Sequence, residues 1–309
     1  MAVVVFGNFG VENSPLYTYF HDPESPWVTI QYDANTVTHR SDKTGAIEHY
    51  YGNFQYDNSG NVVGGTVTGY DELYNGQYVS RVTDWNVPAK PVFDAITTDN
   101  YPQLQEQSLG GDDSITCNIY DDKIYSLGGN DTVIALDGQD YLDGGAGNDD
   151  INGNKGQDTV HGGEGADLVR GGQGNDAVFG DDGDDPHVNG NLGDDIVHGG
   201  NGNDTVFGGQ GNDQLFGDAG NDYLSGDLGN DVMTGGAGAD TFHFGPNSGR
   251  DYVYDFNFAD GDHVLLDHGA TYTVSQSGAD TLVTLGTGDV LVLLGVDSSS
   301  LPSGWLLVS

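Results

Sequence analysis

Basic side chains are scarce in this 309-residue chain, which has 8 lysines and arginines against 48 aspartates and glutamates. The resulting formal charge of -40 excludes nucleic acid and anionic membrane surfaces as partners, because both are polyanions. So much charge of one sign also expands a chain through self-repulsion. The chain is therefore either disordered or neutralised by bound cations when it folds.

Cysteine and long apolar runs are also missing. The single cysteine, Cys117, permits no disulfide within the chain. No stretch approaches the roughly 20 apolar residues that span a membrane, and the first residues lack the features of an N-terminal signal peptide. We expect no transmembrane segment, and we expect any export to use a route that reads no N-terminal signal.

The composition changes twice along the chain. Residues 1–105 are rich in tyrosine and do not repeat, residues 106–244 are rich in glycine, aspartate and asparagine, and residues 245–309 are again apolar and alternating. These changes predict three parts: an N-terminal domain, a repeat region and a C-terminal cap.

The first part has short runs of strand-forming residues separated by turn signals, so we expect a small β-rich domain of unknown role. Its tyrosines suit core packing, with a sugar-binding platform as the alternative. The expected strands are Val3–Phe6, Trp27–Tyr32, Gly65–Thr68 and Tyr78–Thr83.

A nine-residue period runs through the middle part, as in Gly199–Phe207 (GGNGNDTVF) and Gly208–Phe216 (GGQGNDQLF). Glycine occupies the first and fourth positions, aspartate the sixth and a large apolar residue the eighth. The sixth-position aspartate recurs in fifteen units from Asp113 to Asp240, with one extra residue near Pro186. A fixed period of this length indicates stacked structural repeats.

Glycine permits backbone conformations closed to other residues, so each unit can form a tight turn followed by a short strand. Two units make one coil, and coils stack at the ordinary strand spacing of about 4.8 Å. The eighth-position residues then form a thin continuous core. They are Ile151, Val160, Val169, Val178, Val197, Val206, Leu215, Leu224, Met233 and Phe242.

Stacking places the aspartates in rows, which repel unless a cation lies between successive turns. Calcium suits such turns, because it takes 6–8 oxygen ligands and tolerates irregular mixtures of carboxylates and carbonyls. Magnesium demands stricter geometry, and zinc favours Cys or His, which these turns lack.

The nonapeptide resembles the calcium-binding repeat of the RTX family of type I secreted proteins. The resemblance implies a parallel β-roll for the repeat region. Together with the small β-rich N-terminal domain and the C-terminal β cap expected from the strand patterns, the whole chain is expected to be all-β. The resemblance also implies that the aspartates bind the metal, that glycine carbonyls complete each site, and that roughly eight to twelve calcium ions bind. The implied metal-site residues are Asp131, Asp140, Gly144, Asp149, Asp158, Gly162, Asp167, Gly171, Asp176, Asp185, Asp195, Gly199, Asp204, Gly208, Asp213, Asp222, Asp231, Gly235, Asp240 and Asp255.

Within this set, Asp185 is the position where Pro186 should disturb the register. Asp255 lies in Phe242–Asp267, a segment that resembles the one closing RTX rolls, where such an aspartate helps to hold the last calcium. The units Ser108–Thr116 and Cys117–Tyr125 lack the leading glycine and should extend the roll with weak or absent sites.

Alternating residues predict three strands in the cap: Tyr272–Val274, Asp280–Leu285 and Asp289–Leu294. The segment Leu301–Ser309 (LPSGWLLVS) resembles the uncleaved signal read by type I exporters and is also compatible with a final buried strand.

Motifs of hydrolases, metalloproteases and P-loop enzymes are absent, and the nine histidines show no metal-ligand spacing. We therefore expect a non-enzymatic, secreted or cell-surface protein that folds on calcium outside the cell, as a surface-layer, matrix or adhesion component. Its partners would be calcium, the exporter and its own copies. The alternatives are a module that binds polysaccharide or a host surface, and an enzyme or accessory chain acting on polysaccharide through an unrecognised N-terminal site.

Overall fold

The structure is a computed structural model that describes residues 111–116 and 121–309 in full. Before residue 111 it describes the backbone of six strands. They are β1 (Phe20–His21), β2 (Trp27–Tyr32), β3 (Thr36–Ser41), β4 (Ile47–Tyr56), β5 (Val62–Tyr74) and β6 (Gln77–Pro88). The chain divides into two compact units, Met1–Ile119 with Tyr125–Thr132, and Tyr120–Ile124 with Val133–Ser309.

In the first unit, each of the strands β1 to β6 pairs antiparallel with the next, and β7 (Ser114–Thr116) pairs antiparallel with β6. The expected strand Trp27–Tyr32 is β2, and the expected Gly65–Thr68 and Tyr78–Thr83 fall within β5 and β6. Val3–Phe6 and the tyrosine side chains lie outside the described residues. An independent domain over residues 1–105, and the predicted domain boundaries, stay predictions.

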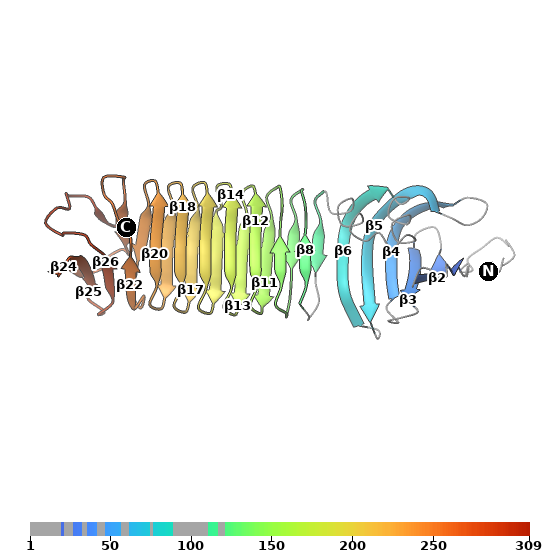
Figure 1. Cartoon of the computed structure of the whole chain (residues 1–309), viewed down its shortest axis with the longest axis horizontal. Helices are drawn as coiled ribbons and strands as arrows, with labels where there is room; N and C mark the ends of the chain where they lie inside the picture. The colour runs from blue at the N-terminus through green and yellow to red at the C-terminus, as the bar shows by residue number, and fades with distance from the viewer. Residues whose placement is uncertain are drawn as a thin grey trace. The chain divides into compact units, whose positions relative to one another are not determined.

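The second unit contains the expected parallel roll. Ile151 pairs with Val169 and Val160 pairs with Val178, so the chain returns to the same register every 18 residues, which is two nonapeptides. Alternate strands therefore belong to two facing parallel sheets, whose stacked strands and turns are visible in Figure 1.

The first sheet contains, in spatial order, β11 (Asp150–Lys155), β13 (Leu168–Gln173), β15 (His187–Leu192), β17 (Thr205–Gln210), β19 (Tyr223–Leu228), β21 (Thr241–Phe244), β23 (His263–Leu266) and β27 (Leu306–Val308). The second sheet contains β24 (Tyr272–Ser277), β25 (Asp280–Leu285), β26 (Val290–Leu293), β22 (Arg250–Val253), β20 (Val232–Ala237), β18 (Gln214–Ala219), β16 (Ile196–Asn201), β14 (Ala177–Asp182), β12 (Thr159–Glu164) and β10 (Tyr141–Asp143). The remaining short strands are β8 (Lys123–Tyr125) and β9 (Thr132–Ile134).

The core between the two sheets is one residue wide per strand. Successive side chains of a strand point to opposite faces, so the eighth-position residue points inward while its neighbours face outward. All ten predicted core residues are fully buried, as are Leu142, which pairs with Val160 in the second sheet, and Val188, which pairs with Val169 in the first. The prediction that the eighth-position residues form the core of the roll is therefore confirmed.

The extra residue of the repeat is accommodated without breaking the stack. The spacing between hydrogen-bonded aspartates is 19 residues for Asp176 with Asp195 and for Asp185 with Asp204, instead of 18. Pro186 lies between Asp185 and the start of β15 at His187, where proline removes no hydrogen bond from within the strand. The predicted disturbance at Asp185 is thus confined to the connection that follows it.

The last coils are closed by an antiparallel hairpin and a final strand. The three predicted cap strands correspond to β24, β25 and β26, which pair in the order β24-β25-β26-β22. The segment Leu301–Ser309 contains the strand β27, which pairs parallel with β23. The expectation that this strand is buried is wrong, because Leu307 and Val308 are exposed. The described residues contain no helix, and hence none long and apolar enough to cross a membrane.

Candidate metal centre

The sixth-position aspartates form a buried ladder on each side of the roll. Asp213 accepts a hydrogen bond at Oδ1 from the backbone N–H of Asp195 at 2.8 Å, and its own N–H donates to Asp231 Oδ1 at 2.9 Å. The same bond links consecutive coils along the roll, always from the N–H of the earlier coil to the carboxylate of the later one. We call these two rows the inner ladders.

The second carboxylate oxygen of these residues, Oδ2, takes no part in the bonds of the inner ladders. In eleven inner-ladder aspartates Oδ2 is buried and has no hydrogen-bond partner among the described residues. A buried charged oxygen without a partner is costly, and native proteins pair such groups or place a cation beside them. The eleven are Asp140, Asp158, Asp167, Asp176, Asp185, Asp195, Asp204, Asp213, Asp222, Asp231 and Asp240.

The first-position glycines leave space beside these oxygens. A β-carbon at Gly199 would lie 2.7 Å from Asp204 Oδ2 and 2.8 Å from the carbonyl oxygen of Gly217, one coil further on. The same arrangement recurs at Gly153 and Gly162. A carboxylate oxygen and a carbonyl oxygen therefore converge at these three glycines, where a side chain is missing, and both are the hard ligands that calcium prefers.

Carboxylates alone do not complete a site. No group of three or more His, Cys, Asp or Glu side chains in residues 111–116 and 121–309 is placed to hold a metal ion. The ligand set that fits is a mixed one, in which carbonyl oxygens of the turns join the unpaired Oδ2 atoms. The donor chemistry of the turns is thus consistent with calcium and unsuited to zinc.

Replacing Gly199 by alanine is expected to close this space. The new methyl group would press on Asp204 and on the backbone of Gly217, so we expect a loss of about 1–3 kcal/mol in the free energy of unfolding in calcium. Urea unfolding followed by circular dichroism measures this. Gly111→Ala is the matched control, because nothing lies within 4 Å of its β-carbon position. An equal loss of unfolding free energy in both variants would show that the space beside Asp204 does not contribute to stability.

Burial shifts the proton equilibrium of the inner ladders. Loss of solvation raises the pKa of Asp213 to about 7; the N–H of Asp195 opposes this shift and the carboxylate of Asp231 adds to it. Burial likewise raises the pKa to about 7 in Asp158, Asp185, Asp195, Asp222 and Asp231, and to about 6 in Asp131, Asp140, Asp204 and Asp240.

In the absence of calcium, acidification is expected to favour the folded roll. The folded state holds protons up to pH 6–7, whereas ordinary aspartate has a pKa of 3.8, so this stabilisation is full below 3.8 and is lost as pH rises through 6–7. Circular dichroism in chelator should therefore show more strand at pH 5 than at pH 8. Sodium chloride at pH 8 is the control for charge screening. Equal strand content at both pH values would contradict the raised pKa values of the inner-ladder aspartates.

The predicted site residues fall into the expected places within the roll. Every predicted aspartate from Asp131 to Asp240 is an inner-ladder residue, and Asp185 is as buried as the rest despite the neighbouring proline. The predicted glycines lie at the first position of their turns. Binding of calcium by these residues stays a prediction.

Asp255 is placed differently from the inner-ladder aspartates. Its side chain is exposed, and its two oxygens accept hydrogen bonds from the N–H groups of Gly235 at 2.9 Å and Gly236 at 2.8 Å. The residue closes a turn of the preceding coil, so its carboxylate already has two partners. Its predicted role at the last calcium site remains untested.

Sequence reasoning missed the last two members of the inner ladders. Asp251 Oδ1 accepts from the N–H of Asp231, and Asp262 Oδ1 accepts from the N–H of Asp240, each at 3.0 Å, and both residues are buried. Their spacing departs from nine, which hid them. The sequence does contain a signal for them. In the regular repeats the inner-ladder aspartate stands two residues before a core residue, and Asp251 and Asp262 stand two residues before Val253 and Val264, which are fully buried.

A second, exposed ladder was also missed. Asn203 Oδ1 accepts from the N–H of Asn221 at 3.0 Å, and Asn212 Oδ1 accepts from the N–H of Asn230 at 3.2 Å. These fifth-position bonds run from the later coil to the earlier one, opposite to the inner ladders. The recurrence of asparagine just before the aspartate could have revealed them.

The outer face of the second sheet has a column of stacked rings at the ninth position. Ring centroids lie 4.6 Å apart for His161 and Phe179, 5.2 Å for Phe179 and His198, and 4.4 Å for His198 and Phe216. A phenylalanine separates the two histidines, so they do not share a ligand. These histidines pack and do not form a metal site.

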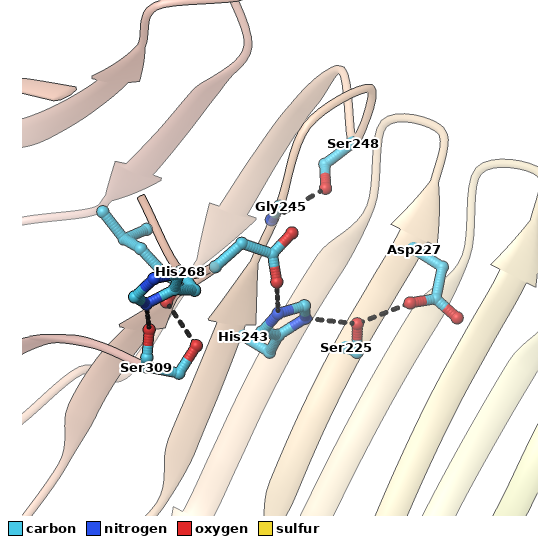
Figure 2. Close-up of polar contacts among 9 residues, drawn as sticks. Ser225, Asp227, His243, Gly245, Ser248, His268 and Ser309 are labelled. Atoms are coloured by element: carbon cyan, nitrogen blue, oxygen red, sulfur yellow. Dashed lines mark hydrogen bonds and ion pairs between the residues drawn. The ribbon is translucent and has the colours of Figure 1, made fainter. Parts of the chain in front are cut away.

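His243 lies in a polar network near the cap (Figure 2). Its Nδ1 is 3.1 Å from Ser225 Oγ and its Nε2 is 3.1 Å from Asp267 Oδ1, while the Ser225 hydroxyl donates to Asp227 Oδ1 at 2.6 Å. The serine proton is directed at Asp227, away from the imidazole, and the serine is buried. The group therefore lacks the geometry of an activated serine nucleophile and instead links successive coils.

Comparison with known proteins agrees with the geometry of the roll. The RTX calcium-binding nonapeptide repeat matches in overlapping stretches that together cover residues 109–185 and 187–253, so that only residue 186 is left out between them. No individual curated protein gives a significant match.

Several solved structures are similar to parts of the chain. The AlgE6R3 subunit of the Azotobacter vinelandii mannuronan C5-epimerase is 29% identical, with 38% of this chain and 79% of that chain covered and a TM-score of 0.31. The AlgE6R2 subunit is 23% identical, with coverage of 45% and 91% and a TM-score of 0.28. The extracellular lipase LipA of Serratia marcescens is 21% identical, with coverage of 50% and 40% and a TM-score of 0.26.

Proposed function

Residues 109–253 form an RTX calcium-binding nonapeptide repeat module, and from that premise we propose that the chain is a secreted protein whose roll folds when calcium binds outside the cell. The proposed role is non-enzymatic, as a surface-layer, matrix or adhesion component. Export through a type I exporter, with Leu301–Ser309 as its signal, is part of the proposal.

The observation that supports this proposal is the row of buried Oδ2 atoms without partners. Each carboxylate that loses its proton adds an uncompensated charge to an interior that water does not reach, so above neutral pH the inner ladders oppose folding until cations neutralise them. The Oδ2 atoms and the facing glycine carbonyls would hold calcium, which supplies the positive charge. Binding free energy then contributes directly to folding free energy.

The charge balance favours many ions over one. Roughly ten calcium ions would supply about +20 against the formal -40 of the chain. Such a number would leave the folded protein acidic and soluble while removing the repulsion within the inner ladders.

Calcium uptake tests the proposal directly. Equilibrium dialysis of the full chain should show roughly eight to twelve bound calcium ions, and magnesium at the same concentration should displace few of them. Uptake of one or two ions only, or equal uptake of magnesium, would contradict the assignment of the repeated turns as the sites.

A further inference from the structure

Strand β24 is the outer edge of the second sheet. It pairs antiparallel with β25 on one side, and no other strand of the described chain pairs with its second side. All six of its residues are exposed, including Tyr272 at 42% and Val274 at 41%. Its free side therefore presents backbone N–H and C=O groups to an incoming strand.

Proteins usually protect such edges. The common devices are lysine or another charge on the strand, proline, a bulge, or a covering loop. Residues 269–279 (GATYTVSQSGA) contain no charge and no proline, and the pairing of β24 with β25 is regular along its whole length. The strand has the features of an edge that accepts a partner, as in recognition by strand addition.

Charge indicates which partner fits. The chain is acidic throughout the roll, where turns of two copies would repel each other, whereas β24 and its flanks form an uncharged stretch at the end of the sheet. The surface where two copies can approach at least electrostatic cost is therefore this edge. A strongly basic partner would instead have been favoured by acidic residues on the strand, and β24 has none.

We propose that β24 is a self-association edge, at which β24 of a second copy pairs antiparallel and joins the two sheets. A two-fold axis at Val274 sets Val274 opposite Val274 of the second copy and Tyr272 opposite Gln276 of the second copy. Uncharged and β-branched residues then meet across the strands, which stabilises antiparallel pairs. The rolls extend away from the junction on opposite sides, so their acidic turns stay apart.

The contact is small, because one six-residue strand from each copy forms it. Interfaces of low buried area are weak and transient, so the dimer should dissociate on dilution. The inference deepens the proposed role as a surface-layer or matrix component by assigning a specific contact between copies, and it requires only that the cap be folded.

Sedimentation velocity in millimolar calcium tests the inference. The unaltered chain should shift from monomer to dimer between low and high micromolar protein. Val274→Lys should weaken dimerisation by about tenfold or more, because two lysines would face each other across the strands. Val274→Thr, which keeps the strand uncharged, should dimerise like the unaltered chain.

Leu228→Lys is the matched control, since Leu228 is 45% exposed and lies on β19, away from this edge. It should leave dimerisation unchanged, and circular dichroism should show that every variant is folded. A chain that stays monomeric at high micromolar concentration would overturn the inference, as would equal losses in Val274→Lys and Leu228→Lys. Calcium uptake would be normal in both of those cases, so failure here is distinct from failure of the proposed function.

Discussion

Removal of calcium at pH 8 is expected to abolish most of the strand signal of the chain in far-UV circular dichroism. One site held at a hundred times its dissociation constant stabilises the folded state by about 2.7 kcal/mol. Several such sites together exceed the 5–15 kcal/mol that typically separates folded from unfolded states. The buried Oδ2 atoms lead to the same expectation, because chelation leaves their negative charges without a neutralising cation and so destabilises the folded roll.

The measurement is a titration of calcium into the chelated chain, followed by circular dichroism and by resistance to protease. Both signals should rise together, and replacement of calcium should restore them fully. Magnesium at the same concentration is the control for ionic strength. A spectrum that is identical in chelator and in millimolar calcium would contradict the proposal that metal binding is coupled to folding.

Replacement of Asp213 by asparagine is expected to have opposite effects with and without calcium. Asparagine keeps the oxygen that accepts from the N–H of Asp195 but has an NH2 group in place of Oδ2, and this group cannot bind a cation. In calcium we expect a loss of about 3 kcal/mol, since a buried charged contact is broken. In chelator at pH 8 the same variant should be more folded than the unaltered chain, because one buried charge is gone.

Asp182→Asn is the matched control for this test. Asp182 is exposed, and its Oδ1 accepts from the side-chain amide of Asn201 at 2.6 Å, a bond that asparagine retains. We expect a change within about 0.5 kcal/mol in both conditions. Unfolding by urea in calcium and strand content in chelator provide the two readouts. A variant at Asp213 that is destabilised equally in both media would show that the carboxylate serves packing alone.

Periodicity made most of the roll predictable from sequence. A nine-residue repeat fixes which residues face inward, because two units form one coil and each strand alternates its side chains. That reasoning places Val206 in the core and Asp204 in the turn before it, as the structure does. Stacking of identical turns makes the prediction strong, since each coil repeats the environment of its neighbours.

Where the repeat ends, prediction from sequence became less accurate. Asp251 and Asp262 continue the inner ladders at irregular spacing, because longer turns precede them, whereas Asp255 is exposed at the edge of a turn. Only the backbone path decides which of these carboxylates points inward. The exposed asparagine ladder was missed for a different reason: asparagine in a turn is common without any ladder, and only stacking shows that Asn203 and Asn221 are bonded.

The direction of the inner ladders has a consequence for the order of assembly. Each turn donates its N–H to the carboxylate of the coil that follows it in sequence, and the last acceptors are Asp251 and Asp262. A coil added on the N-terminal side of a formed coil therefore finds its inner-ladder acceptor already fixed, whereas a coil added on the C-terminal side finds the acceptors of the asparagine ladder, which runs the other way. Because the two ladders have opposite directions, we expect a formed coil to act as a template for the next coil at either end of the stack.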